Sequence, residues 1–356
     1  MQNSATLFFS RNSDLRIPGE FEQQEAIVFG CGQLVRHYPQ TFVDFVTLSH
    51  ERVRLYGIIS PGLERLARIL LATSGLPADA VSFIPRQTSS MWVRDFSPIG
   101  ALNRNGERIF LSFNQEHMRN RDDIGATELF ESQFHGDFRK VELNLEGGNL
   151  LSNGAGLLLS SKTIPMQNQL RGDHNRIAEI LDREAGGAQW AAVSPLQGER
   201  TGHIDLMATF LSPRLLIVGE SDPADHPGNA GILNSMAGSI HGLETAAGKI
   251  QVERIPMPFS GDTHFRSYCN VLFANGLLIV PTYPNINPRL DQEVLARFAA
   301  LLPDWHVVGL DCEEISKKGG SLHCMTMNLP QDLSVIARSR SGIDGTSVQA
   351  KETLPL

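Results

Sequence analysis

The sequence of 356 residues has few cysteines, no long apolar run and only 7% aromatic residues. Its four cysteines are scattered and none forms a Cys-x-x-Cys pair, so the sequence does not indicate a disulfide scaffold. No apolar stretch reaches the roughly 20 residues that a membrane-spanning helix requires. We therefore expect free thiols, one of which is a candidate nucleophile, and no membrane partner.

Basic residues are also in deficit. The chain has 31 Lys+Arg against 39 Asp+Glu, a net charge of −8, which argues against a nucleic-acid-binding protein. An acidic protein suits a cationic substrate. The N-terminus shows no basic start followed by an apolar stretch, so no export signal is indicated and we expect a cytoplasmic protein.

A hairpin pattern recurs along the chain, at intervals of roughly 50–60 residues. In each copy two apolar stretches flank a short turn, and Asn-Gly turns favour hairpins because both residues accept positive φ. The four turns are Asn105-Gly106, Asn153-Gly154, Ser212-Pro213 and Asn275-Gly276. Each hairpin is therefore expected to contribute two strands.

A helix and a third strand are expected after each hairpin. Apolar residues at helical spacing lie at 129–134, 177–181, 232–243 and 294–302. The strands that follow are expected at 141–143, 190–193, 250–252 and 306–310. A fifth, looser unit has a strand at 26–29, a helix at 63–70 and a closing strand at 81–84, with an extra helix and strand inserted at roughly 35–59.

These units predict an α/β fold of five ββαβ units packed around a common axis. Each unit buries little apolar surface alone, so neighbouring units must pack together. An ordinary α/β sheet with coincidental spacing is the alternative. We expect a single catalytic domain over residues 1–338 and a mobile polar tail over 339–356.

Five polar, glycine-rich peptides fall at equivalent places, each after a third strand and before the next hairpin. They occupy residues 92–95, 146–149, 202–205, 264–270 and 319–324. In a closed array, equivalent positions converge on one end of the axis. The sequence therefore predicts a single site built from peptides far apart in the chain.

The residue types at this site predict its chemistry. Cys324 is a candidate nucleophile, and His203 is a candidate general acid and base because its ordinary pKa lies near neutrality. Asp95, Asp205 and Glu146 would raise the pKa of a nearby thiol, which does not suit an anionic or carbonyl substrate. They do suit guanidinium, a planar cation whose paired N–H groups match carboxylates.

Other interpretations of the same residues stay open. A zinc site formed by His203, Asp205, His323 and Cys324 lacks the spacing of common zinc motifs. A thiol protease or amidase would use Cys324, His203 and Asp205 but would leave the other carboxylates unexplained. A non-catalytic binding protein would not need this combination of side chains.

Taken in order, the peptides resemble the agmatine deiminase and bacterial peptidylarginine deiminase family, whose fold is the five-bladed α/β propeller called the pentein. The resemblance begins at Ile17-Pro18-Gly19-Glu20-Phe21 and runs to Pro330. The motifs that carry it are Trp92-Val93-Arg94-Asp95, Glu146-Gly147-Gly148-Asn149, Gly202-His203-Ile204-Asp205, Ser267-Tyr268-Cys269-Asn270 and His323-Cys324.

The resemblance implies a role for each residue. Cys324 would attack the guanidinium carbon, Asp95 and Asp205 would hold its nitrogens, and His203 would protonate departing ammonia and then activate water. The residues expected to bind substrate around them are Trp92, Arg94, Glu146 and Asn270. No metal and no organic cofactor is implied, and the partner is a small guanidino substrate; a homo-oligomer is left open.

The resemblance favours agmatine as substrate, with arginine or peptidylarginine as alternatives and amidino transfer as a second reaction on the same scaffold. Three departures bear on that choice. Ser97 stands where the family has Gly, Thr209 where agmatine enzymes usually have Arg, and Ser321-Leu322 where Asn-Ile commonly precedes His-Cys. No export signal and no added C-terminal domain, both typical of the secreted peptidylarginine enzymes, are evident in the sequence.

Overall fold

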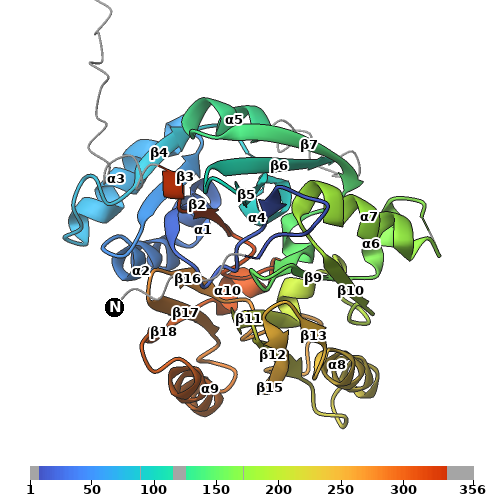
Figure 1. Ribbon diagram of the computed structural model, residues 1–356. Helices are drawn as coiled ribbons and strands as arrows, with labels where there is room; N and C mark the ends of the chain where they lie inside the picture. Colours follow the sequence, from blue (N-terminus) through green and yellow to red (C-terminus); the bar gives the residue numbers. More distant parts are fainter. Residues whose placement is uncertain (1–7, 89, 115–125, 171, 335–356) are drawn as a thin grey trace, which may run out of the picture.

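The computed structural model describes residues 8–88, 90–114, 126–170 and 172–334. Figure 1 shows five sheets of three or four strands arranged as blades in a ring, with most of the helices on the outside. The predicted α/β propeller of five units is confirmed, and the predicted tail over 339–356 lies outside the described residues. Within the described part, no helix has the length and apolar character to span a membrane.

Four blades follow the predicted plan. In each, an inner strand pairs antiparallel with the next strand, and a helix leads to a third strand that pairs in parallel on the outer side. The second blade contains β1 (Leu15–Arg16), β5 (Ile99–Asn103), β6 (Arg108–Asn114), α5 (Ala126–Gln133) and β7 (Asp137–Asn144). The third contains β8 (Leu151–Ser152), β9 (Leu157–Ser161), α6 (Thr163–Gln167), α7 (His174–Ala185) and β10 (Gln189–Val193).

The fourth and fifth blades complete the repeated series. The fourth contains β11 (Ala208–Ser212), β12 (Leu215–Glu220), α8 (Pro227–Ile240), β15 (Gln251–Pro256) and a small hairpin of β13 (Glu244–Thr245) and β14 (Gly248–Lys249). The fifth contains β16 (Leu272–Ala274), β17 (Leu277–Thr282), α9 (Pro288–Leu301) and β18 (His306–Asp311), followed by α10 (Glu313–Ser316).

The first blade closes the ring. It contains β19 (Thr326–Pro330), β2 (Gln24–Gly30), α1 (Cys31–His37), α2 (Pro39–Ser49), β3 (Arg54–Ile59), η1 (Pro61–Leu63), α3 (Glu64–Thr73) and β4 (Ser82–Pro85). Its inner strand, β19, comes from the C-terminal part of the chain and pairs antiparallel with β2. The two ends of the propeller domain are therefore joined within one sheet.

The predicted insertion in the first unit was placed wrongly. β3 pairs in parallel with β2, which is the position of the third strand in every other blade, and β4 lies outside β3. The additional segment is therefore α3 and β4, not the helix and strand at 35–59. Both segments have the same helix-then-strand pattern, so the local pattern could not tell which strand borders β2.

Local sequence explains the edges of several elements. Asp173 caps α7 by accepting a hydrogen bond from the backbone N–H of Arg176, and Gly186 ends that helix with φ +70°. Asn275 and Gly276 have φ values of +51° and +84°, as a two-residue turn with two positive φ angles requires. In β17, Leu277 to Val280 are all buried, because α9 and the neighbouring blades cover both faces of the strand.

Candidate active site

The five polar peptides converge at one end of the axis, each directly before an inner strand. Three of them form short helical turns: α4 (Val93–Phe96), η2 (Gly147–Asn149) and η3 (Ile204–Leu206). Glycine allows these turns to pack closely, since a Cβ on Gly147 would lie 2.4 Å from the carbonyl oxygen of Arg94. The predicted meeting of distant peptides is therefore present in the structure.

The thiol of Cys324 lies at the centre of this cluster. Its Sγ is 3.5 Å from Oδ2 of Asp205, and Nδ2 of Asn270 donates a hydrogen bond to it over 3.4 Å. Burial, together with the charges of Asp205 and Asp95, raises the pKa of this thiol well above its usual value. Cys324 is therefore a protonated thiol before substrate binds. The chain's four cysteines are all buried and free, as expected.

His203 lies between two carboxylates. Its Nε2 is 2.5 Å from Oε2 of Glu146, and its Nδ1 is 3.6 Å from Oδ1 of Asp95. Burial alone disfavours the charged ring, but attraction to Asp95 and the hydrogen bond to Glu146 outweigh it and raise the pKa of His203 to about 10. The ring is therefore an imidazolium at neutral pH, in position to donate a proton.

Two carboxylates carry a buried oxygen without a hydrogen-bond partner. These are Oδ1 of Asp95, which faces Nδ1 of His203 at 3.6 Å without a hydrogen bond, and Oδ1 of Asp205. A Cβ on Gly148 would lie 2.6 Å from Nδ1 of His203 and within 3.3 Å of both carboxylates. Burial and the nearby charges of Glu146 and Asp205 raise the pKa of Asp95 to about 7. The site thus has two unsatisfied acceptors beside one thiol.

A second histidine lies behind Asp205, and the sequence analysis gave it no separate role. Nδ1 of His323 is 2.8 Å from Oδ2 of Asp205, and its Nε2 is 3.0 Å from Oε2 of Glu20. Burial opposes the ionisation of Asp205, but the hydrogen bond from His323 and the charge of His323 outweigh it and hold the pKa of Asp205 below its usual value. Glu20 was not predicted as a site residue, and its only signal was its place in the peptide at which the family resemblance begins.

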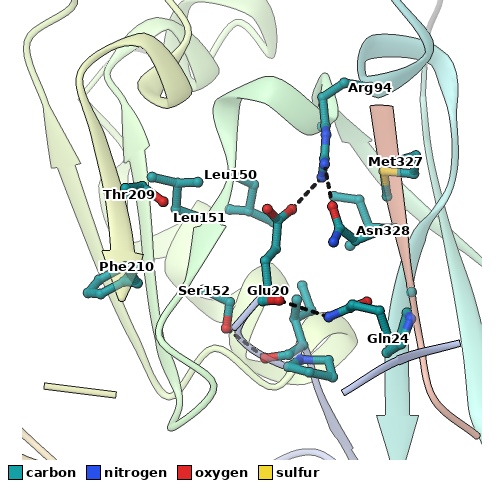
Figure 2. Close-up of a pocket in the computed structure, with 16 residues that line it drawn as sticks. Glu20, Gln24, Arg94, Leu150, Leu151, Ser152, Thr209, Phe210, Met327 and Asn328 are labelled. Carbon is teal, nitrogen blue, oxygen red and sulfur yellow. Dashed lines mark hydrogen bonds and ion pairs between the residues drawn. The ribbon is translucent and has the colours of Figure 1, made fainter. Parts of the chain in front are cut away.

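Arg94 differs from the other predicted binding residues, because its contacts point away from the thiol. Its guanidinium lies 2.6 Å from Oε1 of Glu20 and 3.0 Å from Oδ1 of Asn328, as Figure 2 shows, and its Nε donates to the carbonyl oxygen of Thr326. Its backbone N–H donates to the carbonyl oxygen of Cys324 over 3.2 Å, and its guanidinium is linked to the thiol through the chain of Glu20, His323 and Asp205. Figure 2 also shows the axial cavity that Arg94 and Glu20 line.

Trp92 lies at the outer side of the site. It is half-buried and packs against Gly320, where a Cβ would lie 2.8 Å from its ring. With Tyr38, Arg200 and Lys318, it lines an open pocket beside the site. Among the residues that the structure describes, no group of three or more His, Cys, Asp or Glu side chains is arranged to hold a metal ion.

Comparison with known proteins identifies the family. The model of the Porphyromonas-type peptidyl-arginine deiminase family matches residues 16–330, which is most of the chain. The chain belongs to this family. The family's enzymes are deiminases, hydrolases that act on the C–N bonds of guanidino groups.

Solved structures of this deiminase family share the fold. Agmatine deiminase of Enterococcus faecalis superposes with a TM-score of 0.78 at 21% identity, over 90% of this chain and 96% of the other. A cysteine-to-serine variant of C. jejuni agmatine deiminase, solved with its substrate bound, gives a TM-score of 0.74 at 21% identity, over 89% and 97% of the two chains. The five-bladed pentein propeller is common to all three.

Proposed function

We propose that this chain hydrolyses the guanidinium group of a small substrate to a ureido product and ammonia, with Cys324 as the nucleophile. The observation that carries the proposal is a pair of buried carboxylate oxygens without a hydrogen bond, one on Asp95 and one on Asp205, in the cluster around that thiol. Unsatisfied buried acceptors are costly, and a guanidinium has N–H donors in a planar fork that satisfies both. An ester has no N–H donor, and a neutral amide has no positive charge to compensate the carboxylates.

The charge balance of the cluster supports the same substrate. Three cations face four carboxylates when Asp95 is ionised, which leaves an excess of one negative charge. The cations are Arg94, His203 and His323, and the carboxylates are Glu20, Asp95, Glu146 and Asp205. A single guanidinium neutralises that excess in a buried site where an uncompensated charge is expensive.

Substrate binding also activates the thiol in this proposal. A guanidinium between Asp95 and Asp205 places a positive charge beside the sulfur and cancels the two charges that raise the pKa of Cys324. The thiol then loses its proton, and the thiolate attacks the guanidinium carbon. The same bound cation lowers the pKa of His203 from its high value in the free protein, which makes His203 a better proton donor.

His203 carries the proton transfers. Its imidazolium protonates the nitrogen that leaves as ammonia, and a covalent thiouronium on Cys324 remains. The neutral ring then takes one proton from water as the water oxygen bonds to carbon. The C–S bond breaks, the ureido product forms, and the second water proton restores the thiol. The proton that Cys324 released at the start converts ammonia to ammonium, so the reaction balances.

Agmatine is the first substrate that we propose, with arginine second. The two agmatine deiminases that share the fold favour agmatine. Thr209, one of the departures noted in the sequence, lines the axial cavity with Phe210 rather than the pocket beside Trp92 (Figure 2).

The test is a product assay on agmatine, arginine and a short arginine peptide. Ureido product and ammonia are both measured, and hydrolysis should give them in equal amounts. Cys324→Ser is the control for background hydrolysis. A parallel reaction containing a primary amine tests for amidino transfer, which would yield a new guanidine in place of ammonia. We expect ureido product from agmatine and none from the serine variant.

Ureido product from arginine alone would keep the reaction and correct the substrate. A new guanidine in the amine reaction would replace hydrolysis with amidino transfer. Product formation by the serine variant equal to that of the unaltered chain would overturn the role of Cys324. No product from any guanidine would overturn the proposed function.

A further inference from the structure

A buried chain of alternating charges runs from the axial cavity to the thiol. It begins at Arg94, whose guanidinium is paired with Glu20 over 2.6 Å, and continues through His323 to Asp205. The side chains of Arg94, His323 and Asp205 are at most 5% exposed, and that of Glu20 is 24% exposed. Asp205 ends the chain with Oδ2 on the histidine and 3.5 Å from the sulfur of Cys324. The chain thus connects four distant segments of the sequence to the reacting group.

The geometry specifies the protonation state of His323. Both ring nitrogens face carboxylate oxygens, Nδ1 at 2.8 Å from Asp205 and Nε2 at 3.0–3.1 Å from Glu20. Neutral imidazole has a single N–H, so one of these contacts would bring two lone pairs together. The imidazolium donates to both. The backbone of His323 is also held, because its N–H donates to Oδ1 of Asn270 over 2.9 Å.

We infer that Glu20 is a positioning residue for deimination: it holds His323 as an imidazolium, and His323 fixes the carboxylate of Asp205 beside the thiol. The inference rests on the proposed function and extends it to a residue that touches neither substrate nor thiol. Oδ2 of Asp205 accepts from His323 and lies 3.5 Å from the sulfur, and Oδ1 is buried without a hydrogen bond. Rotation of that carboxylate would break the hydrogen bond to the imidazolium, so both oxygens stay in place beside the thiol.

The charged groups around His323 come from several elements. Glu20 lies between β1 and β2, Arg94 on α4 and Asp205 on η3, with the thiol of Cys324 next in the chain. Burial and the charge of Arg94 oppose ionisation of His323, but Glu20 and Asp205 outweigh them, so its pKa is raised. Removing the charge of Glu20 therefore lowers the pKa of His323, and it also removes the ion pair between Glu20 and Arg94.

The test compares Glu20→Gln with Glu22→Gln. Glu22 is a matched control, because it lies on the same segment and pairs over 2.7 Å with Arg16, which is as buried as Arg94, yet it contacts none of the site residues. We expect Glu20→Gln to lower kcat/KM on the order of 10²-fold, the cost of misplacing a reacting group by about 1 Å. Its loss of activity with rising pH should also begin at a lower pH than in the unaltered chain.

Glu22→Gln should keep the unaltered pH profile, even if it lowers the melting temperature as much as Glu20→Gln does. Equal losses of activity in the two glutamine variants, with unchanged pH profiles, would show a purely structural role and overturn the inference. Glu20→Asp keeps the charge and should retain the unaltered pH profile at reduced kcat/KM.

A second readout does not depend on catalysis. The ¹⁵N resonances of His323 report its protonation directly, and its titration should move to lower pH in Glu20→Gln but not in Glu22→Gln. If no guanidine is turned over by the unaltered chain, the proposed function fails while this titration still tests the charge chain. An unshifted titration in Glu20→Gln would overturn the inference whatever the activity.

Discussion

Two histidines belong to the cluster around the thiol of Cys324, and each lies between two carboxylates, but their hydrogen bonds differ. His323 has carboxylate oxygens at 2.8 Å and 3.0 Å from its two ring nitrogens. His203 has one at 2.5 Å, from Glu146, and the other at 3.6 Å, from Asp95. Both ring nitrogens of His323 are thus within hydrogen-bonding distance of a carboxylate. For His203 this holds only for Nε2, and Nδ1 is too far from Asp95 for a hydrogen bond.

The difference separates two tasks that the same side chain can perform. A ring with two short hydrogen bonds to fixed carboxylates keeps its protons and orients its neighbours, as His323 does for Asp205. A ring with a free edge towards the substrate can give a proton away and take one back, which the proposed mechanism requires of His203. The sequence alone ranks the two histidines by motif, whereas their partners explain why only one of them suits acid–base chemistry.

Replacing the two histidines in turn gives the largest expected effect. His203→Asn removes the proposed proton donor and should lower kcat by about 10²–10⁴-fold, the usual contribution of general acid–base catalysis. His323→Asn should lower kcat/KM less, because it misplaces Asp205 without removing a proton donor. Steady-state kinetics on the best substrate of the panel measures both. A larger loss in His323→Asn than in His203→Asn would reverse the assignment.

Gly148→Ala tests the open space beside Nδ1 of His203, the ring nitrogen without a short hydrogen bond. The added methyl would lie 2.6 Å from Nδ1 of His203 and 3.1–3.3 Å from the carboxylates of Asp205 and Asp95, so these side chains must shift. We expect kcat/KM to fall on the order of 10²-fold with little change in melting temperature.

Gly147→Ala is the contrasting variant. Its methyl would meet the backbone carbonyl of Arg94 at 2.4 Å, where neither atom can move without displacing a turn. The main effect of Gly147→Ala should therefore be a lower melting temperature. If Gly148→Ala melted earlier and kept its activity, Gly148 would serve packing rather than the open space beside His203.

The arrangement of the blades could be predicted from local pattern, and the closure of the ring could not. Asn275-Gly276 and the apolar stretches around it indicate a hairpin within a few residues, and the order of units follows from such signals. The pairing of β19 with β2 joins segments about 300 residues apart, and nothing in either strand names its partner. The misplaced insertion in the first unit has the same origin, since β3 and β4 look alike until their neighbours are known.

The candidate site divides in the same way. Cys324, His203, Asp95 and Asp205 could be predicted because each lies at an equivalent place in its unit. Glu20 lies outside that series, on the segment between β1 and β2, and it contacts His323 across 303 positions of sequence. Ion pairs between residues so far apart in the sequence depend on closure of the ring. The contact of Glu20 with His323 can therefore be recognised only in the three-dimensional structure.

Replacing Asp95 or Asp205 gives the smallest expected effect, a change in melting temperature that has opposite signs for the two residues. The pKa of Asp95 is raised from 3.8 to about 7, so its ionisation destabilises the fold increasingly as pH rises through that range. The pKa of Asp205 is lowered, so its ionised form stabilises the fold at neutral pH. Asp95→Asn should therefore melt higher than the unaltered chain above neutral pH, and Asp205→Asn should melt lower. Each kcal/mol corresponds to about 2–4 °C in a large domain.

Thermal melts of both variants at acidic and alkaline pH measure this contrast. The gain in Asp95→Asn should shrink towards zero as the pH falls to the ordinary range of an aspartate, where the native carboxyl is protonated in the folded chain. Activity should be lost in both variants, because each removes one of the two oxygens proposed to hold the guanidinium. A melting temperature lowered equally in both would mean that Asp95, like Asp205, is stabilised by its histidine. The pair of Asp95 with His203 and the pair of Asp205 with His323 would then differ in geometry but not in their effect on stability.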